Sequence, residues 1–272
     1  MASLKRMRPL LGTFVEIGCE QSDKSAEHAV AAAFGVVEKL HHLLSFHEQA
    51  SDLSRLNQAE GKAVAVHQHT LRVMKLARAM TLASKGLFNC TLGGAMVENG
   101  VLPNHNSPNQ DGAETKASGV ANDIQINAHT ITLSNSIKIT LDGIAKGYAV
   151  DCAIAQLKRF GIKAAWVNAG GDLRVYGDLV LPVHRREING EYVSLGGLQN
   201  AALATSTVTD VYDKTFPGKI VGSSTSPALG SWTVMAHYAW RADALTKVAC
   251  LATAADRATM IERLGGRIVT VK

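Results

Sequence analysis

Two glycine-rich turns, one at each end of a helix–strand unit, are the residues best suited to chemistry. The first, Gly143-Ile144-Ala145-Lys146-Gly147, opens a helix, and the second, Asn168-Ala169-Gly170-Gly171-Asp172, follows a short apolar strand. Glycine lacks a Cβ, so a ligand can approach the backbone amides of such turns closely. Neither turn has the Walker or GxGxxG pattern, so the residues alone indicate an anion-binding turn for an unspecified ligand. Ordinary turn and close-packing positions are the structural alternative for these glycines.

One helix and one strand must position the two turns. The helix between them has apolar residues at the three- and four-residue spacing that is typical of one buried face: Ala149, Ala153, Ile154 and Leu157. Gly161 ends this helix after two basic residues in its last turn, where positive charge suits the helix dipole. A strand is predicted at residues 164–167.

The composition is that of a globular protein with a core. The chain has 272 residues, of which 46% are hydrophobic and 19% charged, enough for one large domain or two small ones. The net charge is +5, and no long Lys/Arg run indicates nucleic-acid binding. A basic cleft for a phosphate-rich small molecule fits this charge equally well.

Cysteines and apolar runs bear on the compartment. The four cysteines form no CxxC pair, so buried free thiols are expected rather than a zinc or redox site. No apolar run reaches the length of a membrane span. The basic start lacks the apolar core of a signal peptide. The chain is therefore expected to be cytoplasmic as written, or periplasmic if an export signal was removed.

Strands and amphipathic helices are interspersed along the rest of the chain. Helices are predicted at residues 26–44, 51–57, 71–84, 241–251 and 254–264, and strands at 10–18, 64–67, 87–94, 124–126, 130–133, 137–141, 232–235 and 268–271. Residues 100–122, rich in Pro and Asn, are predicted to be a surface excursion. Frequent hairpins between helices favour a mixed α+β fold over a parallel βαβ array.

Several segments in a fixed order carry a family resemblance. They are Arg8–Thr13, Ser51–Asn57, Gly86–Asn89, Gly143–Asp151, Val167–Val175, Ala204–Ser206 and Ala242–Leu245. In these the chain resembles the ApbE family, the FAD:protein FMN transferases, over nearly its whole length. The resemblance implies one ApbE-like (T-fold-like) α+β domain over residues 1–272, with largely antiparallel sheets and packed helices.

The resemblance also implies a reaction. Family members hold FAD in a cleft with Mg²⁺, cleave its pyrophosphate and move FMN onto a threonine of a partner flavoprotein, releasing AMP. Other members hydrolyse FAD. A flavoprotein acceptor with a threonine motif is therefore the expected partner, with no nucleic acid and no membrane span. The oligomeric state stays open.

By the same resemblance, individual residues receive roles. The residues matched to the flavin site are Leu11, His47, Leu87, Phe88 and Asn89. Gly143 and Lys146 match the phosphate loop. The metal ligands would be the Ala145 carbonyl, Asp243 and Thr246.

The chain departs from the family pattern at three places. Thr140 and Asp142 stand where the family commonly has Asp and Gly. The stretch Lys219–Pro227 lacks the family's histidine and aspartate, and only Thr225 keeps its place. The third departure is in the helix of Asp243: the family has a threonine four residues after the aspartate, whereas this chain has Lys247 there and Thr246 at three.

Three alternatives follow for that helix. Thr246 still reaches the metal, since positions three and four residues on share a helix face. Alternatively, the Lys247 ammonium occupies the cation's place and pairs with Asp243. In the third alternative, Lys247 is a solvated lysine on an exposed face.

Three functions stay open on the same grounds. An Mg²⁺-dependent FMN transferase is favoured by the resemblance, with Asp142 or Asp243 as the group that accepts the threonine proton. A catalytically impaired FAD-binding paralogue is favoured by the departures. An FAD pyrophosphatase would use water in place of the threonine.

Overall fold

The chain forms two compact units. The computed structural model describes residues 3–105, 115–134, 136–209, 222 and 226–270. Unit 1 comprises Met1–Lys39, Ile144–Gly218 and Ala228–Lys272, and unit 2 comprises Leu40–Gly143 and Lys219–Pro227. The α+β prediction is confirmed, whereas the single domain over residues 1–272 stays a prediction.

Unit 1 is built on a seven-stranded sheet in which every neighbouring pair is antiparallel. The strand order is β1-β2-β6-β7-β10-β11-β12. The strands are β1 (Leu4–Leu10), β2 (Thr13–Cys19), β6 (Ala165–Ala169), β7 (Asp172–Tyr176), β10 (Ala202–Val208), β11 (Gly230–Ala236) and β12 (Gly266–Val269). Alternate residues of β7 face opposite sides, and both sides are buried.

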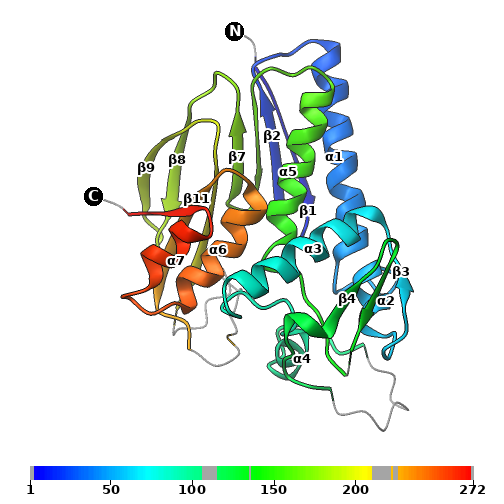
Figure 1. Cartoon of the computed structure of the whole chain (residues 1–272). Helices are drawn as coiled ribbons and strands as arrows, with labels where there is room; N and C mark the ends of the chain where they lie inside the picture. The colour runs from blue at the N-terminus through cyan, green and yellow to red at the C-terminus, as the bar shows by residue number, and fades with distance from the viewer. Residues whose placement is uncertain (1–2, 106–114, 135, 210–221, 223–225, 271–272) are drawn as a thin grey trace. The chain divides into compact units, whose positions relative to one another are not determined.

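Each face of this sheet has its own cover (Figure 1). On one face, α5 (Ala145–Arg159) packs against β6 and β7, and α6 (Ala239–Leu251) packs against β10, β11 and α5. A shorter helix, α7 (Arg257–Arg263), packs on β12 and α6. On the other face, the hairpin of β8 (Leu181–Arg186) and β9 (Tyr192–Leu198) covers Leu173 and Val175 of β7. Asp172 and Arg174 therefore point toward the helices.

Unit 2 combines short helices with a three-stranded sheet of order β3-β5-β4. Its elements are α2 (Asp52–Asn57), β3 (Val64–Ala65), α3 (Gln68–Ala83), α4 (Gly93–Glu98), η1 (Ala121–Asp123), β4 (Ile124–Ile126) and β5 (Thr130–Leu133). The long helix α1 (Lys24–Leu44) begins in unit 1 and ends in unit 2. Its predicted apolar face is buried: Val30, Phe34, Val37, Leu40 and Leu44.

Two predicted elements, the strand at 10–18 and the turn at 168–172, are confirmed only in part, because each range contains a tight two-residue turn and residues of the strands that flank it. Residues 13–18 of the predicted strand belong to β2, whereas Leu10 ends β1, and Leu11 and Gly12 form the turn of this hairpin in the left-handed region. In the same way, the turn predicted at residues 168–172 contains only Gly170 and Gly171, between paired strands β6 and β7. Two-residue turns with positive φ match the twist of such hairpins.

Two strand predictions, at 87–94 and 137–141, are wrong. Both stretches lack strand assignment, and they contact each other irregularly: Thr140 N–H donates to the Cys90 carbonyl, and Gly93 N–H to the Lys138 carbonyl. A Cβ at Gly93 would lie 2.8 Å from the Lys138 backbone, so this close approach needs glycine. The glycines that suggested a strand end instead begin α4.

The predicted excursion at residues 100–122 is anchored at both sides. Leu102 and Ala121 are buried, and Lys116 N–H donates to the Ser136 carbonyl. Residues 106–114 lie outside the described chain. Within the part of the chain that is described, none of the helices has both the length and the apolar content that crossing a bilayer requires.

Candidate active site

The site begins where α5 starts. Its N-cap residue is Ile144, whose side chain has no atom that could accept a hydrogen bond from the first turn. At Gly147 the helix approaches α6 so closely that a Cβ would lie 2.3 Å from the Ala239 carbonyl oxygen. The Gly147 N–H donates to Oδ2 of Asp243 at 3.2 Å. Glycine at 147 thus lets a carboxylate of α6 reach the positive end of α5.

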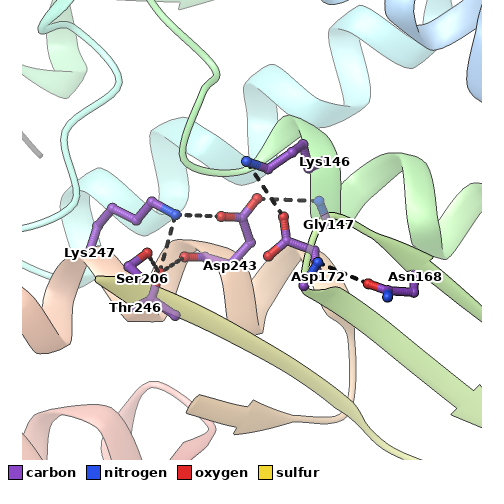
Figure 2. A network of polar contacts seen from close by, with 9 residues as sticks. Lys146, Gly147, Asn168, Asp172, Ser206, Asp243, Thr246 and Lys247 are labelled. Carbon is purple, nitrogen blue, oxygen red and sulfur yellow. Dashed lines mark hydrogen bonds and ion pairs between the residues drawn. The ribbon is translucent and has the colours of Figure 1, made fainter. Parts of the chain in front are cut away.

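Asp243 and Lys247 form an ion pair within α6 (Figure 2). The Lys247 Nζ donates to Asp243 Oδ1 at 2.6 Å and to Thr246 Oγ1 at 3.2 Å. The Asp243 side chain is fully buried and that of Lys247 is 22% exposed. Lys247 is therefore not a solvated surface lysine, which removes one of the three alternatives.

The hydroxyl of Thr246 is fully occupied. It donates to the Asp243 carbonyl at 2.7 Å, and it contacts Ser206 Oγ at 2.7 Å as well as Lys247 Nζ. A hydroxyl has one proton and two lone pairs. With its proton on the carbonyl, its lone pairs accept from Ser206 and Lys247.

Asp172 adds a second buried carboxylate beside this cluster (Figure 2). It opens β7 directly after the Gly170–Gly171 turn, where Gly171 N–H donates to Asn168 Oδ1 at 2.9 Å. Its buried Oδ2 atom accepts no hydrogen bond from the described residues, and Lys146 Nζ lies 4.0 Å away. Burial, together with the charge of Asp243, raises the Asp172 pKa to about 7, against the opposing effect of Lys146 and Lys247.

Two carboxylates and two ammonium groups thus meet in unit 1. Burial lowers the pKa of Lys247, but the carboxylates of Asp243 and Asp172 outweigh it, so the net shift is upward. Lys247 therefore stays protonated at neutral pH. With Lys146 and the N-terminus of α5, whose Gly147 N–H donates to Asp243, it supplies positive charge that an anionic ligand could contact.

The residues present do not fit the expected magnesium ion. Mg²⁺ needs near-octahedral oxygen ligands at about 2.1 Å. Lys247 Nζ occupies the position between Asp243 and Thr246, and the Thr246 lone pairs are already used. Ala145, the third expected ligand, is the half-buried first residue of α5.

The other predicted residues divide between the units. In unit 1, Leu11 lies in the β1–β2 turn with a φ of 58°. The remaining ones lie in unit 2: His47, Leu87, Phe88, Asn89, Asp142 and Gly143. Their roles stay predictions.

Within unit 2, the predicted flavin residues differ in accessibility. His47 is exposed, whereas the Phe88 side chain is 4% exposed; Asp142, the predicted proton acceptor, is exposed as well. Asn89 Oδ1 accepts from both the N–H and the hydroxyl of Thr91, and its Nδ2 donates to Gly119. The Asn89 side chain therefore holds the loop together in this structure.

Sequence reasoning missed Asp172 and Ser206 as members of the site. Asp172 was assigned to a turn, although a two-residue Gly-Gly loop between apolar runs is a hairpin signal that would have placed it at a strand start. Nothing in the local sequence marks Ser206, because its contact with Thr246 joins β10 to α6.

Comparisons with known proteins agree on one family. The family model described as the ApbE family matches residues 11–270. A curated relative, the FAD:protein FMN transferase of Rhodobacter capsulatus, is 29% identical over 179 residues, which are 62% of this chain and 34% of that protein. The match thus spans about a third of that relative's length.

Solved structures show the same fold over nearly the whole chain. The apo form of the Pseudomonas stutzeri flavinyl transferase ApbE has a TM-score of 0.78 at 17% identity, covering 100% of this chain and 95% of that one. The ApbE protein of Thermotoga maritima has a TM-score of 0.79 at 23% identity, covering 98% and 93%. The Vibrio cholerae flavin transferase ApbE has a TM-score of 0.72 at 22% identity, covering 91% and 86%.

Proposed function

Because the chain belongs to the ApbE family, we propose that it binds FAD and transfers FMN to a threonine of a partner flavoprotein. In this reaction the threonine oxygen bonds to the FMN phosphorus, the bond to the AMP oxygen breaks, and AMP leaves. The threonine proton passes to a carboxylate. The observation that carries the proposal is the pair of ammonium groups, Lys146 and Lys247, beside the N-terminus of α5.

The positively charged groups of unit 1 would bind the FAD pyrophosphate. Phosphoryl transfer depends mainly on positioning and charge stabilisation, which fixed ammonium groups and helix amides supply. Both Asp243 oxygens are already hydrogen-bonded, so we assign Asp243 the role of holding Lys247 and Gly147 in place. Asp142, which is exposed, remains our candidate for the group that accepts the proton.

The expected requirement for Mg²⁺ belongs to this proposal only as a condition to be tested. The donor set around Asp243 argues against it, and no step above uses a metal. The family resemblance implies a bound Mg²⁺ ion. Lys247 Nζ, however, already donates to the Asp243 and Thr246 oxygens that would bind it.

A second candidate is an FAD-binding paralogue that has lost the chemistry. The stretch Lys219–Pro227, which lacks the family's histidine and aspartate, favours it. Apart from residues 222, 226 and 227, that stretch lies outside the described chain. A positioned acid–base group contributes about 10²–10⁴ in rate, so its loss would leave binding intact and transfer slow.

One experiment separates these functions. The protein is incubated with FAD, with and without a flavoprotein acceptor that carries a threonine motif, and the products are separated by HPLC. The acceptor is weighed by mass spectrometry. Transfer predicts AMP only with acceptor, and an acceptor heavier by one FMN less one water. AMP and FMN without acceptor indicate a pyrophosphatase, and bound FAD without AMP indicates the paralogue.

A variant tests the residues of unit 1 within the same assay. Asp243→Ala should abolish transfer, because Lys247 and Gly147 lose their common partner. Circular dichroism checks that this variant stays folded. Transfer at the wild-type rate in folded Asp243→Ala protein would remove this network from the mechanism.

A further inference from the structure

The position that the resemblance assigns to magnesium contains a side chain of the protein itself. Lys247 follows Asp243 by four residues, so the two side chains lie on one face of α6. The Nζ atom lies 2.6 Å from Asp243 Oδ1 and 3.2 Å from Thr246 Oγ1. These are the two side-chain oxygens that the resemblance assigns to a metal.

We propose that the Lys247 ammonium is the resident cation of this site, and that it excludes Mg²⁺ and binds a pyrophosphate-bearing ligand without a divalent ion. The ligand part rests on the proposed function, whereas the exclusion of Mg²⁺ does not. A magnesium ion within bonding distance of Asp243 would lie against the ammonium, and two positive charges in a buried site repel strongly.

The occupied oxygens support the exclusion independently of charge. Thr246 Oγ1 already makes three contacts, to the Asp243 carbonyl, Ser206 and Lys247. Binding a metal there would require the loss of one of the two acceptor contacts. Asp243 Oδ2 is held by the Gly147 N–H, which fixes the carboxylate orientation toward Lys247.

The ammonium also has a donor to spare for a ligand. It has three N–H groups, and two of them have acceptors among the residues that the structure describes. The third can donate to a phosphate oxygen. Since the Lys247 side chain is 22% exposed while that of Asp243 is fully buried, a ligand that enters the site meets the lysine side chain before the carboxylate.

The test titrates the full chain, freed of metal, with MgCl₂ alone in a calorimeter. The variant Lys247→Thr restores a threonine four residues after Asp243. Lys163→Thr removes the same charge at an exposed residue of unit 1 and is the control. We expect no Mg²⁺ binding in the wild type and the control, and binding at least about tenfold tighter in Lys247→Thr. Wild-type binding as tight as that of Lys247→Thr would overturn the proposal.

FAD titrations then separate this inference from the proposed function. Wild-type affinity for FAD should be the same within about twofold in EDTA and in MgCl₂, whereas Lys247→Thr should need MgCl₂. Wild-type FAD binding that depends on MgCl₂ would overturn the inference and leave the proposed function standing. Absence of FAD binding in every condition would remove the proposed function, while the MgCl₂ titration still decides the exclusion of the metal. If Lys247→Thr does not fold, the wild-type titrations still test the proposal: Mg²⁺ binding by the wild type, or FAD binding that depends on MgCl₂, would overturn it.

Discussion

Two largely buried carboxylates on the same side of the unit 1 sheet are held in opposite ways. Asp151 of α5 accepts from Arg174 Nη1 and the Ala239 N–H at Oδ1, and from the Trp240 N–H at Oδ2. Asp172 of β7 has a buried Oδ2 without a hydrogen bond from any described residue. Its nearest cation, Lys146, lies 4.0 Å away.

This difference in pairing distinguishes a carboxylate that stabilises the fold, Asp151, from one that belongs to the site, Asp172. Asp151 joins the middle of α5 to the N-terminus of α6, and its partner Arg174 also lies over the Tyr238 ring. Every contact there is internal, which is what stability requires of a buried charge. Asp172 is two residues before Arg174 on the same face of β7, yet it is left incompletely paired, as at functional sites.

Breaking the ion pair of Asp151 with Arg174 should have the largest effect. In Asp151→Ala, Arg174 would stay 10% exposed without its carboxylate, and the start of α6 would lose its two acceptors. We expect a loss of about 3–5 kcal/mol in the free energy of unfolding, measured by urea denaturation.

The exposed ion pair of Lys5 with Glu16 is the control for this prediction. Its side chains are 58% and 25% exposed, so Glu16→Gln should cost less than about 1 kcal/mol. Equal losses in the two variants would mean that Asp151 is no more than a surface contact.

The incompletely paired carboxylate should behave in the opposite way and depend on pH. The pKa of Asp172 is raised to about 7 in the folded state, above its unfolded value near 4. The folded state thus binds the proton more tightly, and stability falls as pH rises from about 4 to about 7. Because an asparagine side chain cannot ionise, we expect Asp172→Asn to be more stable than the wild type by about 2–4 kcal/mol at pH 8.

Denaturation of both proteins at pH 5 and pH 8 checks this sign. The advantage of Asp172→Asn should shrink to about 1–2 kcal/mol at pH 5, where the wild-type carboxyl is protonated in the folded state but already ionised in the unfolded state. An advantage that is equal at the two pH values, or a less stable variant at pH 8, would contradict the assignment of Asp172 as a strained site residue.

The sequence predicted periodic elements well and tight turns poorly. The face of α1 and the helix from Ala145 follow from apolar spacing alone, because burial of one face is a local pattern. The β1–β2 turn was missed because Leu11 is at positive φ, which leucine seldom adopts and which no local signal announces. The strand predictions at 87–94 and 137–141 are wrong because irregular backbone contacts between these two distant stretches determine their conformation.

Some residues of the site could likewise be predicted from the sequence, and others could not. The resemblance brought Lys146, Asp243 and Thr246 into one candidate set, and the structure places them in one network. The state of Asp172 depends on packing beneath two helices, which no spacing records. The sequence left three alternatives for the role of Lys247, because a lysine at this helix position can face a carboxylate or the solvent. Only the three-dimensional structure distinguishes between them.

The close approach of α5 and α6 positions the carboxylates of Asp151 and Asp243, which each join the two helices. A substitution at Gly147 should therefore affect the two together. In Gly147→Ala the new Cβ would lie 2.3 Å from the Ala239 carbonyl, and the helices must separate. We expect a loss of about 1–3 kcal/mol and weaker FAD binding. Gly35→Ala is the control, since Gly35 of α1 has open space and alanine there should stabilise by about 0.5–1 kcal/mol. An unchanged Gly147→Ala protein would mean that this helix contact does not position Asp243.

The smallest effect should come from Ser206, which lies at the border between structure and site. Ser206→Ala removes one contact of the Thr246 hydroxyl but leaves Lys247 on Asp243. We expect a loss of about 0.5–1.5 kcal/mol in unfolding free energy, with FAD affinity unchanged within about twofold. Ser231→Ala breaks the neighbouring Thr207–Ser231 hydroxyl pair of β10 and β11, which does not touch α6, and measures the cost of such a contact alone. If only Ser206→Ala gained Mg²⁺ binding, the saturated Thr246 hydroxyl, and not the ammonium, would be what excludes the metal.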